Sequence, residues 1–342
     1  MEIKLKNILY IIVIIVLGAS TTLLSQTPRD PNPGIDPPEF DRVGQTGWQF
    51  LHLPTTARTA ALADVKNGLI NNNVTAIFNN PANMVEVENM DASFTKINYV
   101  ADISYMTAAF AKNFGKLGNF GLFFANLDVG DMVRTKNLYN SDLGITERSG
   151  DIETFTAGDI QIGLSYARRI TDRLSIGGNV SYIQENLDQT EVKNWNTDFG
   201  LHYRTGFKSL RLSMVARNFG PDKEFTGFTE LYGVPQSVRM PVDFRLGIGF
   251  DPISIENHRI STYLEGVHPN DGPERVHAAV EYSFLNFFAL RGGYKFNYDE
   301  QGLTFGGGLR YSAGGFGGRV DYAYVDFGRL TQVHMFSLGF NL

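Results

Sequence analysis

Hydrophobic positions follow a period of two from about residue 92 to the end of the chain. Within residues 242–250, large apolar side chains alternate with Asp243, Arg245, Gly247 and Gly249. Successive side chains of a strand point to opposite faces, so the pattern predicts strands with one apolar and one polar face. A soluble sandwich also alternates, but its apolar faces need a partner sheet. An apolar face on nearly every strand favours a barrel with lipid outside and water inside.

The alternating region divides into fourteen predicted strands, an even number as in bacterial single-chain barrels. They span residues 92–100, 103–114, 118–128, 154–169, 173–185, 195–205, 209–219, 237–250, 258–267, 274–285, 287–297, 303–312, 316–326 and 332–342. The long connections 129–153 and 220–236 fall on the same side, as expected of outer loops opposite short periplasmic turns. Because backbone in lipid must be fully paired, the sheet has to close.

The last strand carries an apolar residue at every second position. We expect these side chains to face lipid and to form the strand that barrel-assembly machinery reads, with Asn341 facing the lumen or water. The assembly residues are Phe336, Leu338, Phe340 and Leu342.

Charged residues on the polar faces are predicted to line the lumen. They are Asp159, Asp198, Arg204, Arg211, Arg217, Asp243, Arg245, Glu265, Glu281, Arg291, Lys295, Arg310, Arg319 and Asp321. A ring of one sign would indicate ion selectivity. The mixed signs instead favour structural ion pairing around a plug, with a selective polar channel as the alternative.

The N-terminus has the pattern of an export signal. Lys4 and Lys6 precede an apolar run over residues 8–17, and small residues follow. This predicts a signal peptide over 1–25, cut after Ser25 or alternatively after Ser20, and a protein of the outer membrane of a Gram-negative-type bacterium. An uncleaved anchor helix is the alternative.

Two further segments precede the first strand. Residues 26–43 hold five prolines and predict an extended leader. Residues 44–91 do not alternate, and we expect them to form a plug or hatch, with a short helix within 55–63. The polar turn of this plug is Asn79, Asn80, Pro81 and Ala82. The predicted fold class is therefore all-β: a 14-stranded antiparallel transmembrane β-barrel over 92–342 with an N-terminal plug in its lumen.

Composition excludes several classes of function. The 342 residues include 36 Gly and no Cys, and the formal net charge is −6. Without cysteine there is no disulfide, thiolate nucleophile or cysteine-bound metal, and an acidic chain is unsuited to nucleic acid. The histidines lack the i,i+4 spacing of a metal site, and Gly-x-Ser-x-Gly is missing. We therefore predict no catalytic residue, no metal and no cofactor.

The outer loop 220–236 carries aromatic residues among Gly and Pro. Exposed apolar side chains often mark contact sites, so Phe225, Phe228 and Tyr232 are the predicted contacts for a ligand or partner. Packing of this loop over the barrel mouth is the alternative.

Several short motifs carry a family resemblance. They are Gly44-x-x-Gly47-Trp48-Gln49-Phe50-Leu51, Ala57–Ala61, Phe78–Ala82, Tyr166–Gly177, Asp198–Gly200 and Asn218–Gly220. Together they resemble the PorV/PorQ family of FadL-like outer-membrane barrels. Asn83 stands where that family usually has Gly, which favours a stiffer hatch.

The resemblance implies a non-catalytic barrel in contact with outer-membrane lipid. Its first implied role is that of a partner in protein export or surface attachment, as in type IX secretion, binding secretion-machinery or cargo proteins. The alternative is FadL-like transport of long-chain fatty acids or other hydrophobic small molecules.

Overall fold

The computed structural model describes residues 44–69, 73–134, 137–140, 145–148, 153–226, 237–330 and 332–342. The predicted signal peptide and leader lie outside these residues, as do Phe228 and Tyr232.

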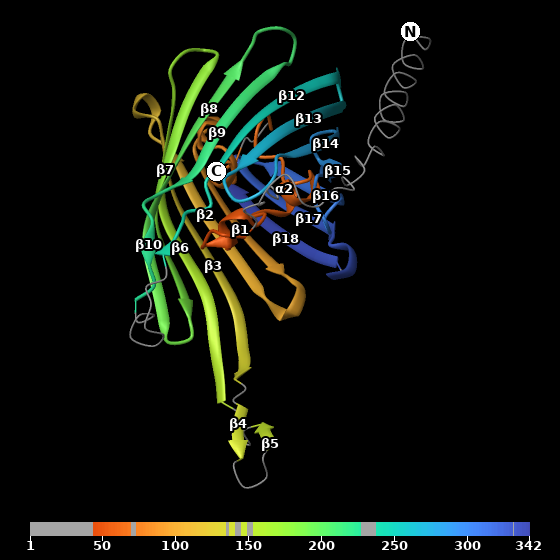
Figure 1. Cartoon of the computed structure of the whole chain (residues 1–342). Coiled ribbons are helices and arrows are strands. Elements are labelled where there is room, and N and C mark those ends of the chain that lie inside the picture. The colour runs from red at the N-terminus through yellow and green to blue at the C-terminus, as the bar shows by residue number, and fades with distance from the viewer. Residues whose placement is uncertain are drawn as a thin grey trace, which may run out of the picture. The chain divides into compact units, whose positions relative to one another are not determined.

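Fourteen antiparallel strands close into one barrel, as predicted (Figure 1). The strands are β1 (Met90–Asn98), β2 (Ser104–Asn113), β3 (Asn119–Arg134), β6 (Glu153–Arg169), β7 (Leu174–Leu187), β8 (Thr190–Arg204), β9 (Arg211–Phe219), β12 (Asp243–Ile255), β13 (His258–Pro269), β14 (Arg275–Phe284), β15 (Phe288–Phe296), β16 (Leu303–Ala313), β17 (Phe316–Asp326) and β18 (Gln332–Asn341). Each pairs with its neighbours along the chain, and β1 pairs with β18 from Asp91↔Asn341 to Asn98↔His334.

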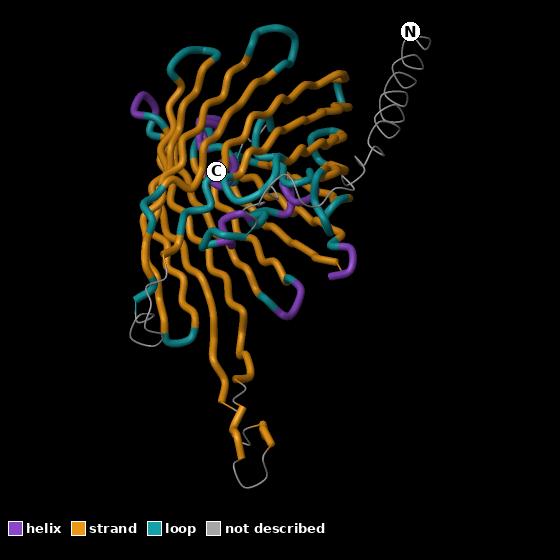
Figure 2. Tube along the Cα trace, in the orientation of Figure 1, coloured by secondary structure: helices purple, strands orange, loops and turns teal. Residues whose placement is uncertain are grey.

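The two ends of the barrel differ in their connections (Figure 2). One end has only short turns. The opposite end, here called the outer mouth, carries the connections after β3 and β9, which hold the two-stranded ribbons β4 (Asn137–Asn140) with β5 (Ile145–Arg148) and β10 (Lys223–Glu224) with β11 (Ser237–Val238). The predicted clustering of both long loops at one end is thus confirmed.

Several predicted strand boundaries are wrong. Strands β3 and β12 extend to Arg134 and Ile255, past the predicted ends at 128 and 250. Residues 237–250 do not form one strand, because Val238 pairs with Lys223 in the separate ribbon and β12 begins only at Asp243. Pro241 lies between the two and has no N–H to continue a ladder. The strand expected from residue 195 begins earlier, at Thr190, after a tight turn that uses Asp188 with a φ of 55°.

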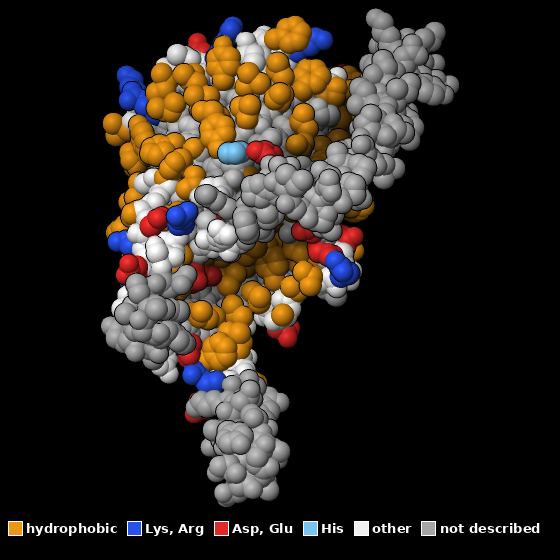
Figure 3. Space-filling view, viewed as in Figure 1, with side chains coloured by type: hydrophobic (Ala, Val, Ile, Leu, Met, Phe, Trp, Pro, Cys, Tyr) orange, Lys and Arg blue, Asp and Glu red, His pale blue; other side chains and the backbone are white. Residues whose placement is uncertain are grey.

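The inward and outward faces follow the predicted alternation. Phe336, Leu338, Phe340 and Leu342 are all exposed on the outside, whereas Ser337 and Gly339 between them are buried. Hydrophobic side chains cover a broad part of the outer surface in Figure 3. This surface is suited to lipid, because a barrel in a bilayer turns its apolar positions outward.

Residues 44–69 and 73–89, here called the N-terminal segment, lie within the ring of strands. The segment contains η1 (Gln49–His52), α2 (Ala57–Ala61), α3 (Ala76–Asn79) and η2 (Pro81–Glu86). Helix α2 contacts β15 to β18, and η2 contacts β6 to β8, so the segment reaches two separate parts of the wall. Three further short helices connect strands: η3 (Val100–Asp102), η4 (Gly115–Leu117) and η5 (Gly328–Leu330).

The expected turn at Asn79 to Ala82 is a junction of two short helices instead. Helix α3 ends at Asn79, and Asn80 caps η2 by accepting a hydrogen bond from Ala82 N at 3.0 Å. Pro81 stands at the first position of η2, where its missing N–H has no helical partner to lose. In the described part of the chain, no helix has the length and apolarity to cross a bilayer.

Candidate functional site

The N-terminal segment begins at the outer mouth. Gly47 N donates to Arg239 O at 3.0 Å, and the Gln49 side chain donates to Asp271 Oδ2 at 2.9 Å. Asp271 follows β13 and Arg239 precedes β12, both on the long-loop end. The segment therefore runs through the lumen from the outer mouth to β1, which starts at the short-turn end.

A cavity of about 310 Å³ opens where the segment meets the wall at the outer mouth. Its apolar lining is Trp48, Phe50, Leu53 and Leu127. We call this cavity the mouth pocket. Apolar walls with a few fixed polar groups are the usual composition of a small-molecule site.

Two carboxyl groups form the polar edge of the mouth pocket. Asp159 of β6 and Glu185 of β7 stand directly opposite each other in the ladder and both line the cavity. Glu185 accepts a hydrogen bond from the backbone N–H of Trp48 at 2.9 Å. Trp48 has a left-handed conformation, with φ at 48°, so this bond helps to hold an unusual backbone that places the indole in the cavity.

Of the predicted loop contacts, the structure describes Phe225 alone. Its ring is partly buried and packs against the apolar cluster that contains Trp48 and Phe50. Thr226 pairs with Glu191 of β8 through two backbone hydrogen bonds. Phe225 therefore agrees with the alternative interpretation, in which the loop packs over the barrel mouth and does not offer a free contact site.

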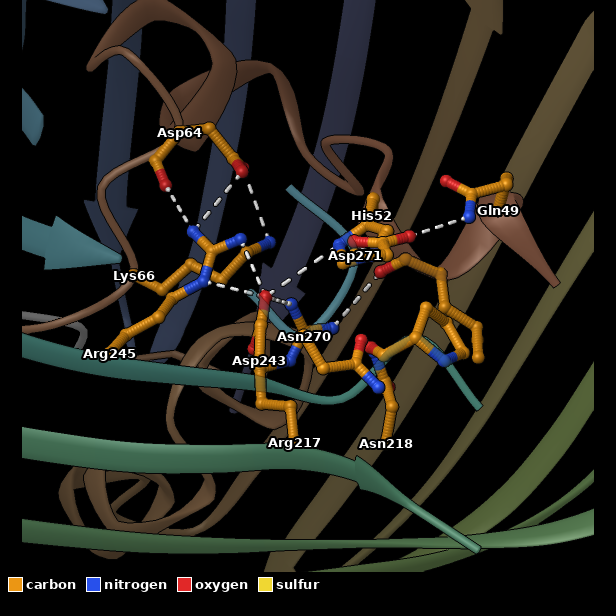
Figure 4. Close-up of polar contacts among 12 residues, drawn as sticks. Gln49, His52, Asp64, Lys66, Arg217, Asn218, Asp243, Arg245, Asn270 and Asp271 are labelled. Carbon is orange, nitrogen blue, oxygen red and sulfur yellow. Dashed lines mark hydrogen bonds and ion pairs between the residues drawn. The ribbon is translucent and has the colours of Figure 1, made fainter. Parts of the chain in front are cut away.

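Below the mouth pocket, a charged network joins the segment to the wall (Figure 4). Arg245 of β12 lies between carboxylates: its guanidinium is 3.5 Å from Asp64, 2.9 Å from Asp243 and 3.2 Å from Glu265. Lys66 Nζ lies 3.2 Å from Asp64. All five groups are buried, and breaking one buried pair typically costs about 3–5 kcal/mol. The network therefore fixes the middle of the segment.

The protonation of the segment's own groups follows from this environment. Burial alone raises the pKa of Asp64, but Lys66 and Arg245 outweigh it and hold that pKa below its usual range. Burial lowers the pKa of Lys66 to about 8, against the opposing effect of Asp64. Burial likewise lowers the pKa of His52 to about 4, although Asp243 and Asp271 lie close to the ring. His52 is therefore neutral at pH 7.

The predicted hatch residues contact the opposite wall closely. Asn80 donates from Nδ2 to the carbonyl oxygens of Leu201 and Met214, each at 3.1 Å. Beneath Pro81 and Ala82 lies Gly177 of β7, where a Cβ would come within 2.5 Å of the Pro81 carbonyl carbon.

Asn83, the residue expected to stiffen the hatch, is only 2% exposed. It lies within η2, whose backbone an asparagine adopts without strain. Whether residues 79–82 move as a hatch stays a prediction.

Most predicted lumen charges are buried and paired with opposite charges. Glu281, for example, binds both Arg58 and Arg291, and Arg291 also binds Asp321. Arg204, by contrast, is exposed at the short-turn end and binds Glu86, and Arg310 has no ion pair with any described residue. These contacts are ion pairs between lumen side chains, as the sequence analysis favoured over a selective polar channel.

The sequence pattern does not reveal the apolar residues that form the mouth pocket or the buried charges of the N-terminal segment. Trp48 and Phe50 stood in a motif of the resemblance, but nothing in the spacing placed them beside Leu127. Asp64 and Lys66 could not be placed inside or outside, because the segment has no regular period. Across the described residues, no group of His, Asp and Glu is arranged to hold a metal ion.

Comparisons with known proteins give a fold but no sequence relative. No family model matches the sequence, and no curated protein matches it. Solved structures do match in shape. The toluene transporter TodX of Pseudomonas putida has a TM-score of 0.56 at 10% identity, covering 83% of this chain and 96% of that one.

Two further structures give similar values. The toluene transporter TbuX of Ralstonia pickettii has a TM-score of 0.52 at 13% identity, covering 83% of this chain and 96% of that one. A FadL homologue of Pseudomonas aeruginosa has a TM-score of 0.51 at 12% identity, covering 84% and 98%. The chain thus has the fold of a FadL-like outer-membrane β-barrel, and at these identities the likeness establishes the fold alone.

Proposed function

We propose that this protein is an outer-membrane channel for hydrophobic small molecules, with the mouth pocket as its entrance site. The mouth pocket carries the proposal, because Trp48, Phe50, Leu53 and Leu127 offer an apolar surface at the end where outer ligands arrive. The fold supports it, since two of the barrels of similar shape are toluene transporters. This is the transporter alternative of the sequence analysis, now preferred.

The N-terminal segment supplies the gate in this proposal. Its upper part, residues 44–53, is held by hydrogen bonds such as Trp48 to Glu185 and by the burial of Trp48 and Phe50 in an apolar cluster. Its middle is held by the buried ion pairs around Arg245. We propose that a ligand in the mouth pocket replaces the apolar contacts of Trp48 and Phe50 and enters the lumen by moving the upper part, while the ion pairs hold the middle in place.

Fluorescence of the two tryptophans tests the entrance site. Trp48 lines the mouth pocket, whereas Trp195 is exposed on the outside. In a Trp195→Phe variant Trp48 is the only emitter, and bromobenzene should quench it saturably. Leu127→Ser should weaken that quenching, and Leu264→Ser on the outer face serves as the matched control. Equal quenching in both serine variants would refute the mouth pocket as the entrance.

The outer-membrane location is tested by labelling introduced cysteines, because the natural chain has none. Gln45 is exposed at the outer mouth and Lys116 at the short-turn end. In intact cells, an impermeant maleimide should label a Gln45→Cys variant and leave Lys116→Cys unlabelled until the membrane is broken. The reverse pattern would invert the proposed orientation.

Protein export remains the second candidate, and the filled lumen favours it. The buried charges around Arg245 and Glu281 close the barrel below the mouth pocket, which suits a partner protein that conducts nothing. Replacing Phe225, Phe228 and Tyr232 together by Ser should abolish partner capture and leave hydrocarbon uptake intact if this candidate is right. If the triple serine variant loses hydrocarbon uptake and still captures its partner, the result favours the channel.

A further inference from the structure

A second cavity, of about 370 Å³, lies at the short-turn end of the lumen. Four arginines line it: Arg58 of the N-terminal segment, Arg259, Arg310 and Arg319. The carboxylate in its lining is Glu281. This arginine cavity differs from the mouth pocket both in place and in chemistry.

The arginines of this cavity are not equally satisfied. Arg58 binds Glu281, and Arg319 binds Asp91 through two hydrogen bonds of 2.9 and 2.6 Å. Arg259 has a single contact with an amide oxygen, that of Asn286 at 3.4 Å. Arg310 has neither a hydrogen bond nor an ion pair with any residue that the structure describes.

The position of Arg310 makes its lack of a partner costly. In the β16–β17 ladder it stands directly opposite Arg319, and like charges in directly opposed positions destabilise a sheet. Arg58 adds a third guanidinium to the same cavity. A guanidinium keeps its proton at neutral pH, so Arg310 cannot relieve this repulsion by becoming neutral.

The charges around the cavity do not balance. The four lining arginines and the adjoining Arg291 face three carboxylates, those of Asp91, Glu281 and Asp321. Two positive charges are therefore in excess.

We propose that the arginine cavity binds a small polar oxyanion, with Arg310 as the main donor and Arg259 and Arg319 beside it. A guanidinium presents paired N–H donors that match carboxylate, sulfate and phosphate oxygens. The lining of arginines and amides suits such an ion and not an alkyl chain, so this site goes beyond the proposed hydrocarbon channel. Phosphate, sulfate and a short dicarboxylate share the chemistry.

Calorimetry on the full chain in a non-ionic detergent tests the site. Inorganic phosphate, sulfate and succinate are titrated at constant ionic strength against sodium chloride. At least one of them should bind saturably at one site, and the three arms identify the class of oxyanion. Arg310→Gln should lower the affinity at least tenfold and Arg310→Lys by less. Arg239→Gln, an exposed arginine at the outer mouth, should change nothing.

Chemical protection of the unmutated protein gives a second measurement. Phenylglyoxal should modify Arg310, and the oxyanion that binds should protect it where chloride does not, as read by peptide mass spectrometry. Equal modification with and without the oxyanions, together with no saturable heat in calorimetry, would overturn the proposal. Wild-type affinity in a folded Arg310→Gln variant would also overturn it.

Discussion

Arg58 and Glu281 form a buried ion pair that joins the N-terminal segment to the barrel wall. Two roughly parallel hydrogen bonds connect them, from Nε to Oε2 at 3.0 Å and from Nη2 to Oε1 at 2.9 Å. The two residues are 3% and 4% exposed. They are separated by more than 200 residues in sequence, so the pair fixes α2 against β14 by tertiary contact alone.

Arg58→Met should loosen the N-terminal segment. Removing one member of a buried pair costs about 3–5 kcal/mol, and the cost here should be near the lower end because Glu281 keeps Arg291. Hydrogen exchange of the α2 amides should therefore speed up by about 100-fold. Lys193→Met, which removes an exposed ion pair with Glu191, is the control and should leave this exchange unchanged.

Gly177→Val should displace Pro81 and Ala82. The glycine has no Cβ, and a side chain there would overlap the Pro81–Ala82 peptide unit; overpacking of this kind costs about 1–3 kcal/mol. Ion conductance through single barrels in a planar bilayer should rise. Gly266→Val is the matched control, because nothing lies within 4 Å of a Cβ at that position. Equal conductance in the two variants would show that η2 does not block the lumen.

Acid should weaken the docking of the upper part of the segment through His52. Its pKa is lowered to about 4 when docked and returns to 6.5 in water, so the undocked state takes up a proton first. Docking is therefore strongest above pH 6.5 and weakens as the pH falls towards 4. Between pH 7 and pH 5 the loss should be about 20-fold.

The same pH series on a His52→Gln variant isolates this contribution. Glutamine cannot titrate, so the difference between the two proteins removes the effects of other groups. Protease cleavage near residue 52 is the measurement. A wild-type profile as flat as that of the variant would argue against His52 as the titrating group.

Because β18 turns Phe340 outward, we expect a charged substitution at this position to impair assembly of the barrel. Phe340 is 53% exposed on the outer surface, and Asn341 belongs to the opposite parity and lines the arginine cavity. Phe340→Asp places a carboxylate towards lipid, at a cost on the order of 1–3 kcal/mol depending on depth. The yield of heat-modifiable barrel should fall for Phe340→Asp and stay near wild type for Asn341→Asp.

The barrel itself was predictable because the alternation of inward and outward side chains depends only on neighbouring positions within one strand. Side chains such as Phe244 and Leu246 face outward, and Arg245 between them faces inward, directly from the pleat of a strand. Strand ends were harder to predict. Val238 pairs in a separate ribbon although it continues an apolar run, since Pro241 interrupts the ladder before β12.

The sites were not predictable to the same degree, because they depend on distant contacts. The mouth pocket joins Trp48 to Leu127, and the arginine cavity joins Arg58 to Arg310. Neither pair is related by a period or a motif. The segment's short helices bury whatever side chains meet the wall, charged ones included, so sequence pattern alone gave no inside and outside for Asp64 or Lys66.

The junction of β1 and β18 closes the ring between the first and last strands. Asp91 pairs with Asn341 there, and the N-terminal segment leads directly into β1. Arg319 extends across Gly339 to Asp91, joining β17 to β1 over the last strand. The N-terminal segment reaches the same junction, because Ala57 N donates to Ser337 Oγ at 2.8 Å. The seam of the barrel is therefore held in two ways, by a side-chain bridge within the wall and by the segment from inside.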